Sequence, residues 1–249
     1  MLPTFALLAA CGASEPREAI DVFFLGNSYT EAYALPGMVA ALSEGLDGPV
    51  IRAEAHVHGG FSLRDHLEDG HLPDVLHATV AGEPLELVVL QEQSTLGVKM
   101  GPDGTIGDPV RFHDAVRELV PLIRERGAEP VLYATWAKQA FPKQTPALTE
   151  AFRTVGEETK ARVSPVGRAW AEVGVSHPEI GLYAKDGSHP SPAGAYLSAC
   201  VLYATLTGRS PVGASRSLSA QHPVRGRVSV SVTAAEAAVL QEVAARVAL

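Results

Sequence analysis

Residues in two short segments have the types needed for nucleophilic catalysis. Ser28 follows an apolar run in "DVFFLGNSYT", and Asp186 and His189 lie three positions apart in "DGSHP". A carboxylate at this spacing can accept a hydrogen bond from one imidazole nitrogen, which leaves the other nitrogen free to take a proton from a serine hydroxyl. A serine activated in this way attacks a carbonyl carbon and forms an acyl-enzyme. The two segments therefore predict this chemistry, provided that the fold brings them together.

Both segments also have a purely structural interpretation. Asn27, Ser28 and Thr30 are residue types that favour turns and helix N-caps, and an Asp-Gly turn beside a loop histidine is common. The combination favours catalysis, because a serine after the first strand and a D-x-x-H loop before the last core helix together supply a nucleophile, a base and an orienting acid.

Strands and helices alternate in the predicted secondary structure. Apolar, β-branched runs predict strands at residues 20–25, 50–57, 85–90, 130–135 and 161–166. Longer segments rich in Ala, Leu, Glu and Arg predict helices at residues 35–45, 62–69, 109–126, 146–160 and 191–207. This alternation predicts an α/β fold with one central parallel sheet. Ligands of such sheets bind beyond the carboxyl ends of the strands, where Ser28 and the "DGSHP" loop would both lie.

The two ends of the chain have their own patterns. After residue 211 a short alternating strand precedes an amphipathic helix that begins near Thr233, a residue type that caps helices. We interpret residues 212–249 as an extension of a single domain that spans residues 19–249. Residues 1–18 are predicted to be a signal segment and linker outside this domain.

The "DVFFLGNSYT" and "DGSHP" segments resemble the SGNH (GDSL-type) hydrolase family, over residues 20–208. Ser28 corresponds to the family's block I serine, and "DGSHP" corresponds to its terminal D-x-x-H-P block. Domains of unknown function with "GNSYT", "LQEQS" and "DGSHPS" segments are similar too. The resemblance implies a flavodoxin-like three-layer α/β/α sandwich, a Ser28–His189–Asp186 triad and no cofactor.

The same resemblance implies an oxyanion hole. Gly60 in "HVHGGFSL" matches the block II glycine, with Gly59 as the alternative, and its N–H would act beside that of Ser28. The usual G-x-N-D of block III is replaced by "VVLQEQST", which looks like the Q-G-E segment of the sialate and xylan acetylesterase branch. We expect Gln91 to be the side-chain donor, with Gln93 as its support or replacement, because residues two apart in an extended segment project to the same side.

Several other residues keep two interpretations. Asn27 stands where block I usually has an aspartate, and it can hold the turn or shape the substrate site. Trp136 follows the fourth strand and can line the cleft or cover the core. His56 and His58 share one strand face as a candidate metal pair, but no third ligand stands at a recognisable spacing. No metal site is therefore expected.

The charge of the chain argues against some partners. With 20 Lys and Arg against 28 Asp and Glu, the formal net charge is −8, which is not the basic composition typical of nucleic-acid binding. No apolar run reaches the roughly 18–20 residues of a membrane span.

The first residues suggest a location for the protein. "MLPTFALLAACGAS" resembles a bacterial lipoprotein signal with Cys11 as the lipidated residue. It departs from such signals because it is short and has no Lys or Arg before the apolar run. We expect an envelope protein, lipid-anchored or secreted, with membrane contact only through Cys11, or a cytoplasmic protein if this segment is not a signal.

Together these patterns predict a serine esterase that hydrolyses short-chain esters. The acetyl group and a carbohydrate or small-molecule substrate are implied by the resemblance alone. The alternatives are an O-acyltransferase that uses the same triad, and a non-catalytic, envelope-anchored domain that binds carbohydrate.

Overall fold

A five-stranded parallel sheet forms the centre of the protein. The computed structural model describes residues 17–72, 77, 79–96 and 104–249. The strands run in the order β2-β1-β5-β6-β7 and every neighbouring pair is parallel. Their bounds are β1 Ala19–Gly26, β2 Val50–Val57, β5 Leu87–Gln91, β6 Glu129–Tyr133 and β7 Arg162–Ser164. Parallel neighbours cannot be joined by a tight hairpin, so longer crossovers connect them.

Side chains of the strands divide into two cores, one on each face of the sheet. In β1, Val22 and Phe24 belong to one core, whereas Phe23 and Leu25 belong to the other. This division follows from the alternation of side chains along an extended strand. A strand buried on both faces needs apolar residues at nearly every position, which explains the continuous apolar run before Ser28.

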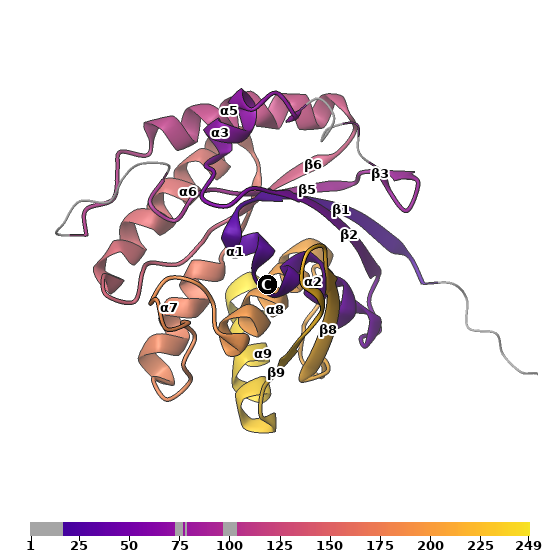
Figure 1. Cartoon of the computed structure of the whole chain (residues 1–249), viewed down its shortest axis with the longest axis vertical. Coiled ribbons are helices and arrows are strands. Elements are labelled where there is room, and N and C mark those ends of the chain that lie inside the picture. The colour runs from indigo at the N-terminus through magenta and orange to yellow at the C-terminus, as the bar shows by residue number, and fades with distance from the viewer. Residues whose placement is uncertain (1–16, 73–76, 78, 97–103) are drawn as a thin grey trace, which may run out of the picture.

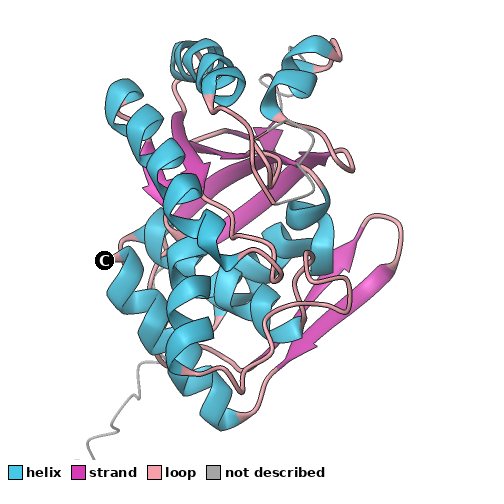
Figure 2. Cartoon of the chain, turned by 90° about the vertical axis from the view of Figure 1, so that its left-hand side faces the viewer, coloured by secondary structure: helices cyan, strands magenta, loops and turns pink. Residues whose placement is uncertain are grey.

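Helices cover both faces of the sheet (Figure 1), and the same layers are visible after a quarter turn (Figure 2). One layer consists of α3 Leu63–Glu68, α5 Val110–Glu125 and α6 Thr145–Thr159. The other consists of α2 Leu35–Glu44, α7 Val166–Ser176, α8 Pro192–Thr207 and α9 Ala234–Ala248. The predicted three-layer α/β/α fold is therefore confirmed.

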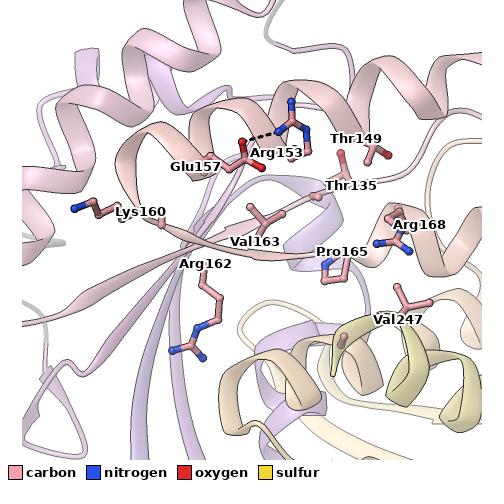
Figure 3. Close-up of a pocket in the computed structure, with 15 residues that line it drawn as sticks. Thr135, Thr149, Arg153, Glu157, Lys160, Arg162, Val163, Pro165, Arg168 and Val247 are labelled. Atoms are coloured by element: carbon pink, nitrogen blue, oxygen red, sulfur yellow. Dashed lines mark hydrogen bonds and ion pairs between the residues drawn. The ribbon is translucent and has the colours of Figure 1, made fainter.

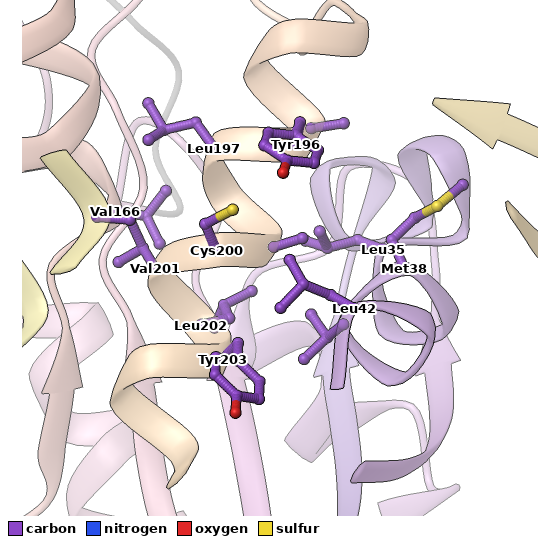
Figure 4. Close-up of a cluster of buried hydrophobic side chains, with 14 of the residues drawn as sticks. Leu35, Met38, Leu42, Val166, Tyr196, Leu197, Cys200, Val201, Leu202 and Tyr203 are labelled. Atoms are coloured by element: carbon purple, nitrogen blue, oxygen red, sulfur yellow. The ribbon is translucent and has the colours of Figure 1, made fainter. Parts of the chain in front are cut away.

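Helix α8 is the most deeply buried helix of its layer, and residues 193–206 of it are all buried. Tyr196, Cys200 and Tyr203 of α8 lie near Leu35 and Leu42 of α2 (Figure 4). α8 packs against α2 and α7, and α9 also covers it, which explains why it is apolar on all sides. Among the helices of the described residues, none has the length and hydrophobicity to cross a bilayer.

The last strand of the sheet is shorter than predicted, and a helix follows it that the sequence pattern did not indicate. The predicted strand at residues 161–166 ends at Ser164 because Pro165 has no N–H for a further ladder bond. Val166 then begins α7. Gly167 is required there, since a Cβ at this position would lie 2.1 Å from the carbonyl oxygen of Thr135.

The C-terminal segment adds a β-hairpin and a helix to the α8 layer. Strands β8 (Ser217–His222) and β9 (Gly226–Ser231) are antiparallel, and α9 follows with Thr233 as its N-cap. Leu218, Val230 and Leu240 join the same core as α8. The remaining elements are short: α1 Ser28–Glu31, η1 Ala32–Ala34, β3 Thr79–Val80, β4 Glu83–Pro84 and η2 Pro142–Gln144.

Candidate active site

Ser28 is the first residue of helix α1, immediately beyond the carboxyl end of β1. Asn27 is the N-cap of this helix, and its side-chain Oδ1 accepts a hydrogen bond from the Tyr29 N–H at 3.2 Å. Gly26 precedes it in a crowded position, where a Cβ would lie 2.5 Å from Thr30 Oγ1. A side chain at residue 26 would therefore displace the turn that presents Ser28.

Ser28, His189 and Asp186 form a continuous hydrogen-bonded chain. The distance from Ser28 Oγ to His189 Nε2 is 2.9 Å, and that from His189 Nδ1 to Asp186 Oδ2 is 2.5 Å. Because a carboxylate only accepts, Nδ1 carries the imidazole proton and Nε2 is left to accept the serine proton. The structure thus brings together the nucleophile, base and acid that the sequence predicts.

The carboxylate of Asp186 is held in its charged form. Its hydrogen bond with His189 lowers the pKa of Asp186 to about 2, with further help from the Ser188 N–H. Asp186 Oδ1 accepts from the N–H groups of Ser188 and His189 at 2.9 and 3.0 Å. The same carboxylate therefore fixes both the loop backbone and the orientation of the imidazole.

Three stacked aromatic rings support the loop that carries His189. Trp136 lies between Tyr29 and Trp170, with ring centroids 4.6 and 3.7 Å away. Trp136 Nε1 donates to the Ser188 carbonyl oxygen at 2.9 Å, and the Tyr29 hydroxyl lies 2.7 Å from Ser188 Oγ. Trp136 is only 1% exposed, so it covers the core and positions the loop instead of lining the cleft.

The loop that contains Gly59 and Gly60 is held against the residues that precede Ser28. Asn27 Nδ2 donates to the Phe61 carbonyl oxygen at 2.7 Å, and the His58 N–H donates to the Gly26 carbonyl oxygen at 3.1 Å. Both glycines are exposed, and Gly60 has a φ of +81°, a conformation that favours glycine. Asn27 therefore holds the turn and also ties this loop to it.

Gln91 does not have the position that the sequence analysis gave it. Its side chain is fully buried, and Oε1 accepts from the Asn27 N–H at 2.9 Å and from Thr30 Oγ1 at 3.0 Å. Its Nε2 donates to the Glu92 carbonyl oxygen at 2.5 Å. Since β5 extends to Gln91, this side chain lies under the turn and braces it, with no exposed surface.

Gln93 has the more suitable position for a side-chain donor. It is partly exposed, and its Oε1 accepts from the Thr95 N–H and Oγ1 at 2.7 and 2.6 Å. These bonds fix which end of the amide is the oxygen, and its Nε2 has no acceptor within the part of the chain that the structure describes. An anchored amide with a free N–H₂ group is the arrangement that an oxyanion hole requires.

Comparison with known proteins places the chain in a family. Neither a protein-family model nor a curated protein sequence matches it. A solved structure from Slackia heliotrinireducens, described as an SGNH hydrolase, is 31% identical, with 76% of this chain and 100% of that chain covered and a TM-score of 0.59. The chain belongs to the SGNH hydrolase family. It is accordingly a hydrolase by its family.

Two more distant structures share the fold of this SGNH hydrolase. A DUF4886 family protein from Bacteroides uniformis is 18% identical with a TM-score of 0.67, covering 92% of this chain and 94% of that chain. An acetyl xylan esterase, AlAXEase, is 16% identical with a TM-score of 0.57, covering 74% of this chain and 98% of that chain.

Ser28 and His189 of this SGNH hydrolase line a cleft with a volume of about 530 Å³. The C-terminal hairpin forms one of its walls, and the sequence analysis did not predict that contribution. The remaining lining residues are Glu31, Ala32, Tyr33, Pro190, Arg225, Val228 and Ser229. Tyr33 and its neighbour Ala34 have φ values of 56° and 53°, which are unusual for residues with a side chain and recur at ligand sites.

His222 connects the hairpin to the opposite wall of the cleft. It is 1% exposed, and its Nδ1 accepts from the N–H groups of Val224 and Arg225 at 3.1 and 3.2 Å. Its Nε2 lies 3.6 Å from Oε1 of Glu31. His222 therefore binds the turn that presents Arg225, and its Nε2 faces Glu31 beyond hydrogen-bond distance.

A second cavity of about 590 Å³ lies elsewhere, along the edge strand β7. Thr135, Arg162 and Arg168 are among its lining residues, and Arg153 and Glu157 form an ion pair on α6 beside it (Figure 3). None of the three residues of the hydrogen-bonded chain lines it. Ser28 and His189 line the smaller cleft instead.

Glu92 is a buried carboxyl group immediately after the last residue of β5. It is fully buried, and burial raises its pKa to about 8 although the Gln93 and Leu63 N–H groups both donate to it. Desolvation of the charged form therefore outweighs these two bonds. Glu92 links the end of β5 to the start of α3, a role that the sequence did not reveal.

Proposed function

We propose that this SGNH hydrolase is a serine esterase that removes short acyl groups, such as acetyl, from a polar alcohol. The observation that carries this proposal is the chain of hydrogen bonds from Ser28 Oγ through His189 to Asp186, at 2.9 and 2.5 Å. It opens into a cleft on one side and is backed by a rigid aromatic stack on the other.

The proposed reaction has two stages. His189 Nε2 takes the proton of Ser28 as Oγ bonds to the ester carbonyl carbon, and the same proton then passes to the leaving alcohol oxygen as the ester C–O bond breaks. In the second stage His189 takes a proton from water, whose oxygen attacks the acyl-enzyme. The carboxylic acid leaves and Ser28 recovers its proton. Asp186, whose pKa is lowered to about 2, stabilises the imidazolium throughout.

The negative charge on the carbonyl oxygen needs nearby donors during both stages. We assign this role to the N–H groups of Ser28 and Gly60 and to Nε2 of Gln93. Ser28 begins a helix, so its N–H is not used by an intrahelical bond. The support for Gln93 is its anchored amide, and the support for Gly60 is its loop, which Asn27 binds. Donors of this kind typically contribute about 10²- to 10³-fold to turnover.

The composition of the cleft supports a polar alcohol as the leaving group. Glu31, Arg225 and Ser229 provide charged and hydroxyl groups along its walls, and Tyr33 offers an aromatic ring beside them. Sugar hydroxyls and sugar ring faces suit such a mixture of groups. The acetyl xylan esterase of the same fold acts on an acetylated carbohydrate by its name, and we extend a carbohydrate ester to this chain as part of the proposal.

An envelope location belongs to the same proposal. It is based on the lipoprotein-like segment that ends in Cys11, and this segment lies outside the described residues. Membrane fractionation of bacterial cells that express the protein or its Cys11→Ser variant tests it, with release of the variant from the membrane fraction as the expected result. An unchanged distribution would contradict the lipid anchor.

Hydrolysis of 4-nitrophenyl esters of increasing acyl length tests the proposed activity. We expect kcat/KM to be highest for acetate or propionate and to fall toward octanoate. Acetylated sugars should compete as substrates, with release of acetate to water. Ser176, an exposed serine on α7, provides the matched control Ser176→Ala, which should retain full activity. A preference for octanoate, or greater acyl transfer to added sugar than hydrolysis, would contradict the proposal.

A further inference from the structure

Three side chains with metal-binding atoms lie together beside the active-site turn. His56 is the next-to-last residue of β2, His66 lies on α3, and Asp69 is the C-cap of that helix. One ligand atom of each residue lies within 4.8 Å of the others. Asp69 Oδ2 is 3.8 Å from His56 Nε2 and 4.0 Å from His66 Nδ1.

The protonation state of His66 leaves one of its nitrogens free for a ligand. Its Nε2 lies 2.9 Å from the Gly26 carbonyl oxygen, which can only accept, so Nε2 carries the proton. Burial lowers the pKa of His66, so the imidazole is neutral and Nδ1 has a lone pair. The side chain is 1% exposed, and Nδ1 has no hydrogen-bond partner among the residues that the structure describes. A buried acceptor that points at a carboxylate without a partner needs an explanation.

The other two side chains leave access from solvent. The side chain of Asp69 is 16% exposed and that of His56 is 34% exposed. The His71 N–H donates to Asp69 Oδ1 at 2.9 Å, which leaves Oδ2 as the oxygen closest to both imidazoles. The ring of His71 is exposed and 6.0 Å from that of His56. The cluster therefore has a rigid buried ligand, two partly exposed ligands and a neighbouring imidazole.

We propose that His56 Nε2, His66 Nδ1 and Asp69 Oδ2 bind a divalent transition-metal ion of the zinc type, with His71 or water as the fourth ligand. Two imidazoles and one carboxylate suit Zn²⁺, whereas Ca²⁺ and Mg²⁺ prefer oxygen ligands. Ligand bonds of about 2.0–2.1 Å require neighbouring ligand atoms about 3.3 Å apart in a tetrahedron. The present separations are larger, at 3.8 and 4.0 Å from Asp69 Oδ2 and within 4.8 Å for the whole set, so the side chains of His56 and Asp69 must move toward the ion while His66 stays in place.

The position of this metal site suggests a structural role. His66 Nε2 donates to the carbonyl of Gly26, two residues before Ser28. A metal-bound imidazole commonly donates its other N–H to a backbone carbonyl, and this contact fixes its orientation. The ring of Phe61 also lies 5.2 Å from that of His66. An ion would thus join β2 to α3 beside the turn, and none of its three ligands lines the cleft.

In the structure His56 lies near His66 and Asp69, whereas the candidate pair in the sequence joined it to His58. His58 does not join the cluster, because its ring stacks on Phe61 with centroids 3.7 Å apart. His56 finds its partners ten and thirteen residues later, after a loop and a short helix. The expectation of no metal site rested on the absence of a third ligand near the pair.

Metal titration of tag-free, chelator-treated protein tests this proposal directly. Calorimetry with Zn²⁺ should give one site per chain, and Co²⁺ should give the visible absorption of a four-coordinate site. The variants His56→Gln and Asp69→Asn should each weaken binding at least about 10-fold. They change partly exposed side chains, so both are expected to fold, and circular dichroism checks this.

The histidine at position 177 supplies a matched control. His177 Nδ1 lies 3.2 Å from Glu179 Oε1 on the surface, a histidine–carboxylate pair for which the described residues offer no third ligand. His177→Gln should bind Zn²⁺ as tightly as the unchanged protein. The proposal is overturned if no saturable site is found, or if the His56 and Asp69 variants bind Zn²⁺ and Co²⁺ as the unchanged protein does.

Discussion

At the scale of single residues, two glutamines of one short segment have different roles. Sequence spacing suggested that Gln91 and Gln93 project to the same side, with Gln91 nearer the reaction. Their different burial could not be predicted, because it depends on the turn after β1 packing over Gln91. Gln93 lies beyond the last residue of β5, where regular strand alternation no longer holds.

Substitution of each glutamine distinguishes the structural role of Gln91 from the proposed oxyanion-donor role of Gln93. Gln93→Ala should lower kcat about 10²- to 10³-fold with little change in stability, because it removes an oxyanion donor. Gln91→Ala should instead lower the free energy of unfolding by about 1–3 kcal/mol, since it leaves the buried Asn27 N–H without an acceptor. Steady-state kinetics and denaturant unfolding measure the two effects. Normal turnover in Gln93→Ala would exclude it as the donor.

Glu92 should make the stability of the protein depend on pH. Its folded pKa of about 8 lies above its ordinary value of 4.5, so between these values the unfolded chain has lost a proton that the folded chain retains. The free energy of unfolding therefore falls as pH rises from about 5 to 8 and levels off above that. Glu92→Gln should reduce this slope, as measured by urea unfolding across that range.

The exposed Glu242 on α9 gives a matched control for this pH dependence. Glu242→Gln should keep the slope of the unchanged protein. An unaltered slope in Glu92→Gln would show that another group causes it.

At the scale of elements, local patterns predicted most of the sheet and its crossovers. β2 has the predicted bounds, and α6 and α8 begin and end within one residue of their predicted positions. Helix α7 was not predicted because its segment "VGRAWAEVGVS" contains two glycines, which disfavour helices, and one of them is needed for contact with Thr135. Tertiary packing overrides local propensity at that point.

The stacked rings of Tyr29, Trp136 and Trp170 position the loop that carries His189. Trp136→Phe keeps an aromatic ring but removes the N–H that binds the Ser188 carbonyl. We expect kcat to fall about 3- to 10-fold with little change in KM, which corresponds to the loss of one hydrogen bond. The pH–rate profile should broaden or shift if the orientation of His189 is what changes.

Trp170→Phe is the matched control for this effect. Phe keeps the ring in the stack, and the change removes a similar hydrogen bond, from Trp170 Nε1 to Ser198 Oγ at 3.1 Å, whose acceptor lies on α8 and not on the loop. This variant should lose stability and retain kcat. Equal losses of kcat in both variants would indicate a general loss of packing.

At the scale of the whole molecule, the sheet brings together segments about 160 residues apart in the chain. The triad was predictable from sequence because parallel strands end at one edge, so a loop after β1 and a loop before α8 meet there. The contribution of the β8–β9 hairpin to the cleft wall could not be predicted. An alternating pattern indicates which side of a strand is buried, but it does not indicate the surface against which the strand packs. The cluster of His56, His66 and Asp69 could not be predicted for the same reason, because it depends on how α3 packs beside β2.

Covalent labelling tests whether Ser28 is the nucleophile of the proposed reaction. A fluorophosphonate should add one adduct per chain by intact-protein mass spectrometry, and peptide analysis should locate it on Ser28. Ser28→Ala should take up no adduct and should lose ester hydrolysis, while Ser176→Ala should label like the unchanged protein. An adduct on another serine, or full hydrolysis by Ser28→Ala, would show that Ser28 is not the nucleophile.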